Sequence, residues 1–300
     1  MSALEAHIDE HRSELEAFAY RMLGDRSEAE DVVSDAFLRW YQLSEAERIG
    51  IAAPRSWLFK VTSRIALDRM KSARSRRECY VGPWLPEPWL MDEYSPLDRV
   101  GVDESVTLAM MLALEHLSPA ERAVLILREV FAFGFEDIAQ GIGKTPSHCR
   151  KLLSRARSAL RTRHARYELD ARVHQRLLTA FSHACAKGDL EALRSMLAQD
   201  VQLHTDGGGV VSAARRIVSS NDKVSRFFVG LSNKQKKSGV VFREKLCTSN
   251  ALPTLVLSLH GRIESVISFA VADGKIDRVF IQRNPRKLQR LSALDVVGGA

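Results

Sequence analysis

The sequence predicts a multidomain protein in which two all-α domains are followed by an α+β domain. The length of 300 residues suits two or three domains of ordinary size. Apolar residues recur at helical spacing before residue 165, and segments that alternate apolar and polar residues follow residue 171. The expected domains are a helical bundle over 1–78, a linker over 79–103, a helix-turn-helix domain over 104–167 and an α+β domain over 168–300.

The composition excludes several classes of protein. Charged residues make up 27% and hydrophobic residues 45%, which is ordinary for a globular protein and argues against a disordered chain or a coiled coil. We find no stretch long and apolar enough to span a membrane and no secretory pattern at the N-terminus. Cys79, Cys149, Cys185 and Cys247 lie far apart with no CxxC pair, so we expect reduced cysteines, no metal site, no cofactor and a cytoplasmic location.

The net charge of +7 is unevenly distributed along the chain. Residues 172–300 contain 20 Lys and Arg against 10 Asp and Glu. Two further stretches, 55–77 and 144–166, contain eight Lys and Arg each with few or no acids. Such clusters suit the phosphate backbone of a nucleic acid, although a solvated helix face is an equally common explanation for charge alone.

The first domain is expected to contain three main helices. Ser27 followed three residues later by Glu30 matches a capping box, and Pro54 suits the first turn of the third helix. Trp57 belongs to the apolar stripe of that third helix, which favours a core position over contact with DNA. Glu30, Asp31 and Asp35 form an acidic face suited to a basic partner surface, with a solvated face as the alternative.

Prolines and tryptophans distinguish the linker that follows. Three prolines and a glycine within residues 79–89 exclude a helix and indicate an extended segment. Trp84 and Trp89 are large apolar side chains that favour burial. We therefore expect this linker to pack against another part of the protein.

Residues 118–160 are typical of a helix-turn-helix. Ser118 and Pro119 give an N-cap and a first helical residue, and a short helix over 135–140 leads into the glycine turn 141–144. Thr145 can cap the next helix, whose inward face is apolar and whose other face is basic. The alternative is a plain three-helix bundle with a basic surface. The candidates for contact with bases or phosphates are Ser147, His148, Arg150, Lys151, Ser154 and Arg155.

The last domain is expected to combine helices with an antiparallel sheet. A strand over 201–204 runs into a glycine loop, 205–209, and further strands are expected over 239–247, 254–260, 263–272 and 275–282. Asp273-Gly274 is a strong hairpin signal between the last two strands. His204, Asp206 and His260 could supply acid–base chemistry in a pocket, but no paired carboxylates accompany them, so we assign no catalytic residue.

Residues 1–165 resemble sigma-70 family factors of the extracytoplasmic-function (ECF) type. Residues 28–40 resemble the helix of region 2 that binds core polymerase, and residues 55–68 resemble the segment that melts the −10 element. Residues 117–161 resemble region 4, which reads the −35 element. Arg64 stands where many relatives have Asn.

The rest of the chain resembles the SigJ-like subgroup of these factors, which has a fused, cone-shaped SnoaL-like domain. Three motifs support the resemblance. They are Trp84, Leu85, Pro86, Glu87 and Pro88 in the linker, Asp206, Gly207, Gly208 and Gly209 in the glycine loop, and Asn284, Pro285, Lys287 and Leu288 near the C-terminus. In the C-terminal motif, Arg286 stands where the family usually has an acidic residue.

The resemblance implies a sigma factor that binds core RNA polymerase and promoter DNA and is not an enzyme. The acidic face would meet the polymerase, and the basic stretch of the third helix would hold promoter phosphates near the melted strand, beside Trp57 and Phe59. Its DNA-binding candidates are Lys60, Arg64, Arg69, Lys71 and Arg74. The three motifs would regulate the sigma domains in cis, with no separate anti-sigma factor and a monomeric free state.

Two alternatives remain at this point. The chain could be a helix-turn-helix regulator with a ligand-binding domain, which would bind duplex DNA without core polymerase. Alternatively, the C-terminal domain could add an enzymatic activity, which a buried His204–Asp206 pair facing an apolar cavity would favour.

Overall fold

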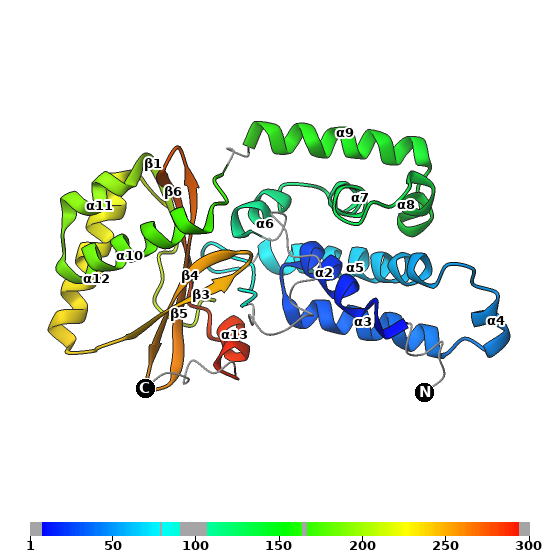
Figure 1. Ribbon diagram of the computed structural model, residues 1–300, viewed down its shortest axis with the longest axis horizontal. Coiled ribbons are helices and arrows are strands. Elements are labelled where there is room, and N and C mark those ends of the chain that lie inside the picture. The colour runs from blue at the N-terminus through cyan, green and yellow to red at the C-terminus, as the bar shows by residue number, and fades with distance from the viewer. Residues whose placement is uncertain (1–7, 79, 91–106, 164–166, 294–300) are drawn as a thin grey trace. The chain divides into compact units, whose positions relative to one another are not determined.

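The computed structural model describes residues 8–78, 80–90, 107–163 and 167–293, which form two compact units (Figure 1). The helical unit holds residues 8–78 and 110–163 of this described part. The C-terminal unit holds residues 80–90, 107–109 and 167–293. The linker segment 80–90 therefore folds as part of the C-terminal unit.

The first half of the helical unit consists of α2 (Arg12–Leu23), α3 (Arg26–Tyr41), α4 (Glu45–Ile49) and α5 (Pro54–Glu78). The expected start of α5 at Pro54 is confirmed, whereas the expected capping box at Ser27 and Glu30 is wrong. Asp25 caps α3 instead, because its Oδ1 accepts the Glu28 N–H at 2.9 Å. Gly24, with a φ of 70°, already ends α2, so Asp25 is the first capable side chain after the reversal.

The second half of this unit consists of α6 (Leu108–Leu114) from Met110 onward, α7 (Pro119–Glu129), α8 (Phe135–Ile142) and α9 (Pro146–Arg163). Ser118 and Glu121 form the capping box of α7, and the Thr145 hydroxyl accepts the His148 N–H at the start of α9, as expected. Apolar residues at helical spacing over 104–117 also predict a helix; of these residues, 104–106 lie outside the described part and Leu108–Leu114 form α6. Gly143, with a φ of 67°, makes the turn between α8 and α9.

An aromatic cluster joins the two halves of the helical unit. Phe18 of α2 and Phe59 of α5 pack against Phe131 and Phe133, which follow α7, with ring centroids 4.8–6.0 Å apart. The guanidinium of Arg55 lies 4.7 Å from the centroid of the Phe133 ring. The halves thus share one apolar core rather than two separate ones.

The C-terminal unit is built on one six-stranded sheet in the order β2-β1-β6-β5-β4-β3. Its strands are β1 (Leu197–Asp206), β2 (Val218–Ser219), β3 (Arg243–Ser249), β4 (Leu252–Leu259), β5 (Arg262–Ala272) and β6 (Lys275–Gln282). The expected antiparallel pairing holds for β1–β2, β3–β4, β4–β5 and β5–β6, whereas β1 pairs with β6 in parallel. The Asp273-Gly274 hairpin is confirmed, with both residues at positive φ between antiparallel β5 and β6.

Three helices cover one face of this sheet: α10 (Ala171–Lys187), α11 (Leu190–Met196) and α12 (Asn221–Ser238) (Figure 1). Side chains from these helices and from alternate residues of the strands, such as Phe181, Phe228 and Phe269, fill the space between them. The opposite face carries a smaller cluster that includes Leu90 of the linker and Leu288 of α13 (Pro285–Leu288). The short helix η3 (Gln289–Ala293) follows α13.

No helix in the described part of the chain is both long and apolar enough to cross a membrane.

Candidate nucleic-acid interface and buried carboxylate cluster

The helix α9 presents a buried apolar row and an exposed polar row, as a recognition helix requires. Cys149, Leu152 and Leu153 are buried between α7 and α8. All six sequence candidates on this helix are exposed: Ser147, His148, Arg150, Lys151, Ser154 and Arg155. Arg150 also packs over the Phe135 ring at 5.0 Å, which holds its guanidinium near the start of α8.

The basic candidates on α5 are largely engaged within the helical unit. Arg64 is exposed, but its Nη2 donates to the Gln140 carbonyl at 3.2 Å. Lys71 donates to Asp68 at 2.8 Å, and Lys60 is half-buried. The side chain of Arg74 lies outside the described residues.

Arg69 links the predicted DNA-binding set to the predicted polymerase-binding set. Its guanidinium lies 3.0 Å from the Asp35 carboxylate and 3.7 Å from that of Asp31. Glu30 lies 3.4 Å from Arg26 on the same helix. The acidic face is thus partly neutralised from within the unit.

The two aromatic residues expected near melted DNA both belong to the core. Phe59 is only 2% exposed and lies in the aromatic cluster, so in this structure its ring is covered by Phe18, Phe131 and Phe133. Trp57 is half-buried, with its ring 5.2 Å from that of Trp40, which matches the core position favoured by the apolar stripe.

The helix α8 packs directly on the same part of α5. A Cβ placed on Gly141 would lie 3.7 Å from the Cα of Lys60 and 4.0 Å from the Cβ of Ser63. The buried Ser63 hydroxyl at this contact has no hydrogen-bond partner within the described residues. Since unsatisfied buried hydroxyls are costly, this contact is less stabilising than its apolar packing alone.

The Asp206 carboxylate is the centre of a buried polar cluster in the C-terminal unit. It is fully buried and accepts hydrogen bonds from four segments of the chain. The donors, which together with the carboxylate we call the Asp206 cluster, are Tyr80 Oη at 2.6 Å, Leu85 N at 3.0 Å, Gly208 N at 2.9 Å, Gln282 Nε2 at 3.3 Å and Lys287 Nζ at 2.8 Å. The Asp206 carboxylate is therefore hydrogen-bonded to the linker, the glycine loop, the last strand and the tail.

Lys287 is the cation of this cluster. Its side chain is 9% exposed, and its Nζ also donates to the Leu85 carbonyl and lies 4.4 Å from the centroid of the Trp84 ring. The burial of Tyr80, together with its hydrogen bond to Asp206, raises the pKa of the phenol. Tyr80 therefore stays a donor to the carboxylate.

Glycine is required in the loop because other segments approach its backbone. At Gly208, with a φ of 64°, a Cβ would lie 2.5 Å from the side-chain amide of Asn284. At Gly207 a Cβ would lie 2.5 Å from the Val211 carbonyl oxygen. Asn284 also donates to Tyr80 Oη at 2.8 Å and caps α13 by accepting the Arg286 N–H.

The linker is held at its other end as well. Trp89 N donates to Asn250 Oδ1 at 3.0 Å, and the Trp89 carbonyl accepts the Asn250 N–H at 3.0 Å. Leu90 forms an antiparallel bridge with Ser249. The segment 80–90 is thus fixed to the sheet at both ends.

The candidate acid–base residues do not form a catalytic group. The carboxylate of Asp206 is occupied by its five donors, and the ring of His204 pairs instead with Gln202 at 3.2 Å. Burial, and secondarily the charge of Arg278, lowers the pKa of His204 to about 4. His260 lies in the exposed turn between β4 and β5.

Comparison with known proteins decides the family. A model of Sigma-70 region 2 matches residues 7–76, and a model of Sigma-70, region 4 matches residues 107–160. The ECF RNA polymerase sigma factor SigJ of Mycobacterium tuberculosis is 34% identical over 92% of this chain and 90% of its own length. The chain belongs to the ECF RNA polymerase sigma factors.

A second relative and the crystal structure of SigJ extend this result over nearly the whole chain. The probable ECF RNA polymerase sigma factor SigI of M. tuberculosis is 32% identical over 94% of both chains. The crystal structure of the M. tuberculosis extracytoplasmic function sigma factor SigJ superimposes with a TM-score of 0.76 at 31% identity, covering 95% of this chain and 98% of that chain. The C-terminal unit is therefore part of the shared architecture, and the fold class and family expected from the sequence are confirmed.

Sequence reasoning missed two members of the Asp206 cluster in this sigma factor, Tyr80 and Gln282. Tyr80 lies just before the proline-rich linker, where a lone aromatic residue gives no specific signal. Gln282 ends β6 directly opposite Asp206 in the parallel register. A sequence cannot show that pairing without the order of the strands.

Proposed function

We propose that this ECF sigma factor directs core RNA polymerase to its promoters and that the C-terminal unit regulates it in cis through the Asp206 cluster. On this proposal α9 reads the −35 element, α5 meets the −10 element, and the acidic face of α3 meets the polymerase. The free protein is a monomer that acts in the cytoplasm without a cofactor, a catalytic activity or a separate anti-sigma factor.

The observation that supports cis regulation most directly is the capture of the linker. The segment 80–90 connects the region 2 helices to the region 4 helices, yet it is bonded to the C-terminal unit at Asp206 and at Asn250. A free linker would behave as a flexible chain and let regions 2 and 4 move apart. A linker fixed to the C-terminal unit shortens the distance over which they can separate. The state of the Asp206 cluster would thereby set how far region 4 can move from region 2.

The Asp206 cluster suits a switch between a docked and a released tail, because the buried charges of Asp206 and Lys287 stabilise each other. Breaking a buried ion pair by removing one partner costs about 3–5 kcal/mol, since the other charge is left uncompensated. Loss of the tail would remove Lys287 and Asn284 together and leave the Asp206 carboxylate without its cation. We therefore expect the linker to be held only while the tail is docked.

The motifs assigned to regulation have distinct parts in this proposal. Trp84 provides the ring against Lys287, Leu85 the backbone donor, and Pro86 a carbonyl that accepts from Gln282 at 3.3 Å. Glu87 and Pro88 are buried in the same linker. In the tail, Pro285 opens α13 and Leu288 packs on the sheet face beside Leu90.

Run-off transcription with purified core polymerase tests the proposal, using a promoter selected with the full-length holoenzyme. We compare the full chain with truncations after residue 282 and after residue 170, and with Asp206→Asn. The matched control is Asp200→Asn, because Asp200 is an exposed carboxylate on the same strand. We expect the truncation after 282 to raise output, because it removes the tail that holds the linker. We expect the truncation after 170 to lower output, because on this proposal the rest of the C-terminal unit also holds the sigma domains in a competent arrangement. Unchanged output from both truncations would exclude regulation in cis.

A further inference from the structure

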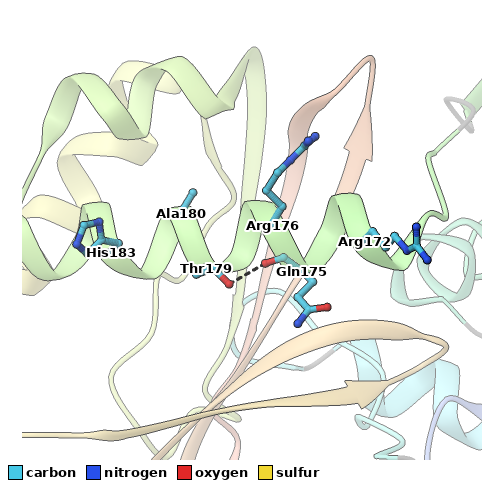
Figure 2. Close-up of a pocket in the computed structure, with 6 residues that line it drawn as sticks. All are labelled: Arg172, Gln175, Arg176, Thr179, Ala180 and His183. Atoms are coloured by element: carbon cyan, nitrogen blue, oxygen red, sulfur yellow. Dashed lines mark hydrogen bonds between the residues drawn. The ribbon is translucent and has the colours of Figure 1, made fainter.

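The helix α10 of the C-terminal unit has an exposed cationic face that the Asp206 cluster does not use. A groove of about 690 Å³ lies along it, lined by Arg172, Gln175, Arg176, Thr179, Ala180 and His183, which we call the α10 basic face (Figure 2). Their spacing of three and four residues places them on one side of the helix, over about 16 Å from first to last. Figure 2 shows Arg172 and Arg176 as consecutive cations along this side.

The charge of this face is not neutralised within the unit. Arg172 and Arg176 form no ion pair with any described carboxylate, and α10 contains no Asp or Glu. By contrast, Arg194 and Arg226 of the same unit both contact Asp222. Two carboxylates border the face, since Asp170 caps the helix through the Arg172 N–H at 2.8 Å and Glu244 accepts from the Ser182 hydroxyl.

We propose that the α10 basic face binds the phosphate backbone of duplex DNA, as a contact separate from the promoter-reading helices. Arginine and amide groups are side-chain donors that commonly contact phosphate, and this face presents Arg172, Arg176 and Gln175 together. The Thr179 hydroxyl is not one of these donors, because it donates to the Gln175 carbonyl at 2.9 Å (Figure 2). Such contacts contain no base-specific readout, so they would add affinity without changing which promoter is chosen. The proposal assumes that the chain acts on DNA but not that the Asp206 cluster regulates it.

The test measures how the affinity for duplex DNA depends on salt. The probe is a fluorescein-labelled duplex of random sequence, titrated with the full chain at several salt concentrations and followed by anisotropy. Arg172→Gln/Arg176→Gln is compared with Lys234→Gln/Lys237→Gln, which removes the same charge from exposed positions on α12. The slope of log K against log salt is negative, and each lost phosphate contact reduces its magnitude by about 0.9.

We expect the α10 variant to make this negative slope shallower by about 1.8 and to weaken binding at low salt. The α12 variant should leave the slope unchanged. Equal slopes for the wild type and the α10 variant overturn the proposal. An equal decrease in slope magnitude in the α10 and α12 variants also overturns it, because net charge alone would then explain the effect. A wild-type chain that does not bind duplex at low salt overturns it too.

A second measurement separates DNA from an acidic protein surface as the occupant. Binding of the labelled chain to core polymerase is measured without DNA. If the α10 variant weakens this binding and leaves the duplex slope unchanged, the face contacts the polymerase and the DNA proposal is wrong. Run-off transcription by the tail truncations tests the Asp206 cluster independently, so the failure of one proposal is distinguishable from that of the other.

Discussion

At the scale of single residues, the Asp206 carboxylate should contribute strongly to the stability of the C-terminal unit. Asp206→Asn keeps the shape of the side chain but removes the charge beside Lys287 and places an NH2 group among five donors. We expect the free energy of unfolding to fall by about 3–5 kcal/mol, measured by chemical denaturation of the full chain. Asp200→Asn should change it by less than about 0.5 kcal/mol. A small effect at Asp206 would mean that the cluster is not closed in solution.

His204 predicts a dependence of stability on pH. Its pKa is lowered to about 4 in the folded chain by burial and by Arg278, against about 6.5 in the unfolded chain. The unfolded state therefore takes up a proton first as the pH falls, and stability should decrease from about pH 6.5 down to pH 4. The loss at pH 5 should be about 2 kcal/mol.

The control for His204 uses two variants in the same denaturation series. His204→Gln should flatten the dependence between pH 6.5 and 4, because a neutral amide takes up no proton. His260→Asn, in an exposed turn, should retain the wild-type profile, since Asn tolerates the φ of 50° found there. An unchanged profile in His204→Gln would assign the acid sensitivity to another group.

At the scale of secondary-structure elements, two capping boxes of the same kind should have different effects. Ser118 with Glu121 caps α7, which contributes Ala123, Val124 and Leu127 to the core, whereas Ser44 with Glu47 caps α4, which has no buried residue. Ser118→Ala should lower the free energy of unfolding by about 1 kcal/mol, a typical value for a lost N-cap. Ser44→Ala should have a smaller effect, because α4 can fray without opening the core. Equal losses in thermal or chemical unfolding would show that capping acts independently of packing here.

The sequence predicted correctly those features that depend on a few neighbouring residues. The start of α5 at Pro54, the caps at Ser118 and Thr145, and the Asp273-Gly274 hairpin each depend on residues within one turn. The departures from expectation have a different origin. The capping box at Ser27 competed with a better-placed Asp25, and the parallel pairing of β1 with β6 joins segments that are far apart in the chain. Long-range pairing is set by the order of the strands, which local patterns do not contain.

The candidate site shows the same limit. The exposed row of α9 follows from helical period and charge, and all its members lie as expected. The engagement of Arg64 by Gln140 and of Arg69 by Asp35 depends on how α8 and α3 pack on α5. The motif around Asp206 was recognisable by resemblance, but its donors Tyr80 and Gln282 required the fold.

At the scale of the whole molecule, the contact between α5 and α8 should be incompatible with promoter binding. The −35 and −10 elements are about 25 base pairs apart by their names, or roughly 80 Å at about 3.4 Å per base pair. In this structure α8, the first helix of the helix-turn-helix, covers Lys60 and Ser63 of the helix assigned to the −10 element. If α5 and α9 read these elements as proposed, region 4 has to leave region 2 before both can be read, and a covalent link across this contact should block initiation.

Ser63→Cys/Gly141→Cys supplies that link. A Cβ at position 141 would lie 4.0 Å from the Cβ of Ser63, which is within the range for an unstrained disulfide. We expect run-off transcription to fall more than about tenfold when the double variant is oxidised and to recover with dithiothreitol, since the link holds region 4 on region 2. The two single-cysteine variants should respond to neither treatment, and mass spectrometry of the peptides confirms which cysteines are joined. A cross-linked protein that transcribes at the wild-type rate would show that region 4 can remain on region 2 during initiation, and the assignment of α5 and α9 to separate promoter elements would then be wrong.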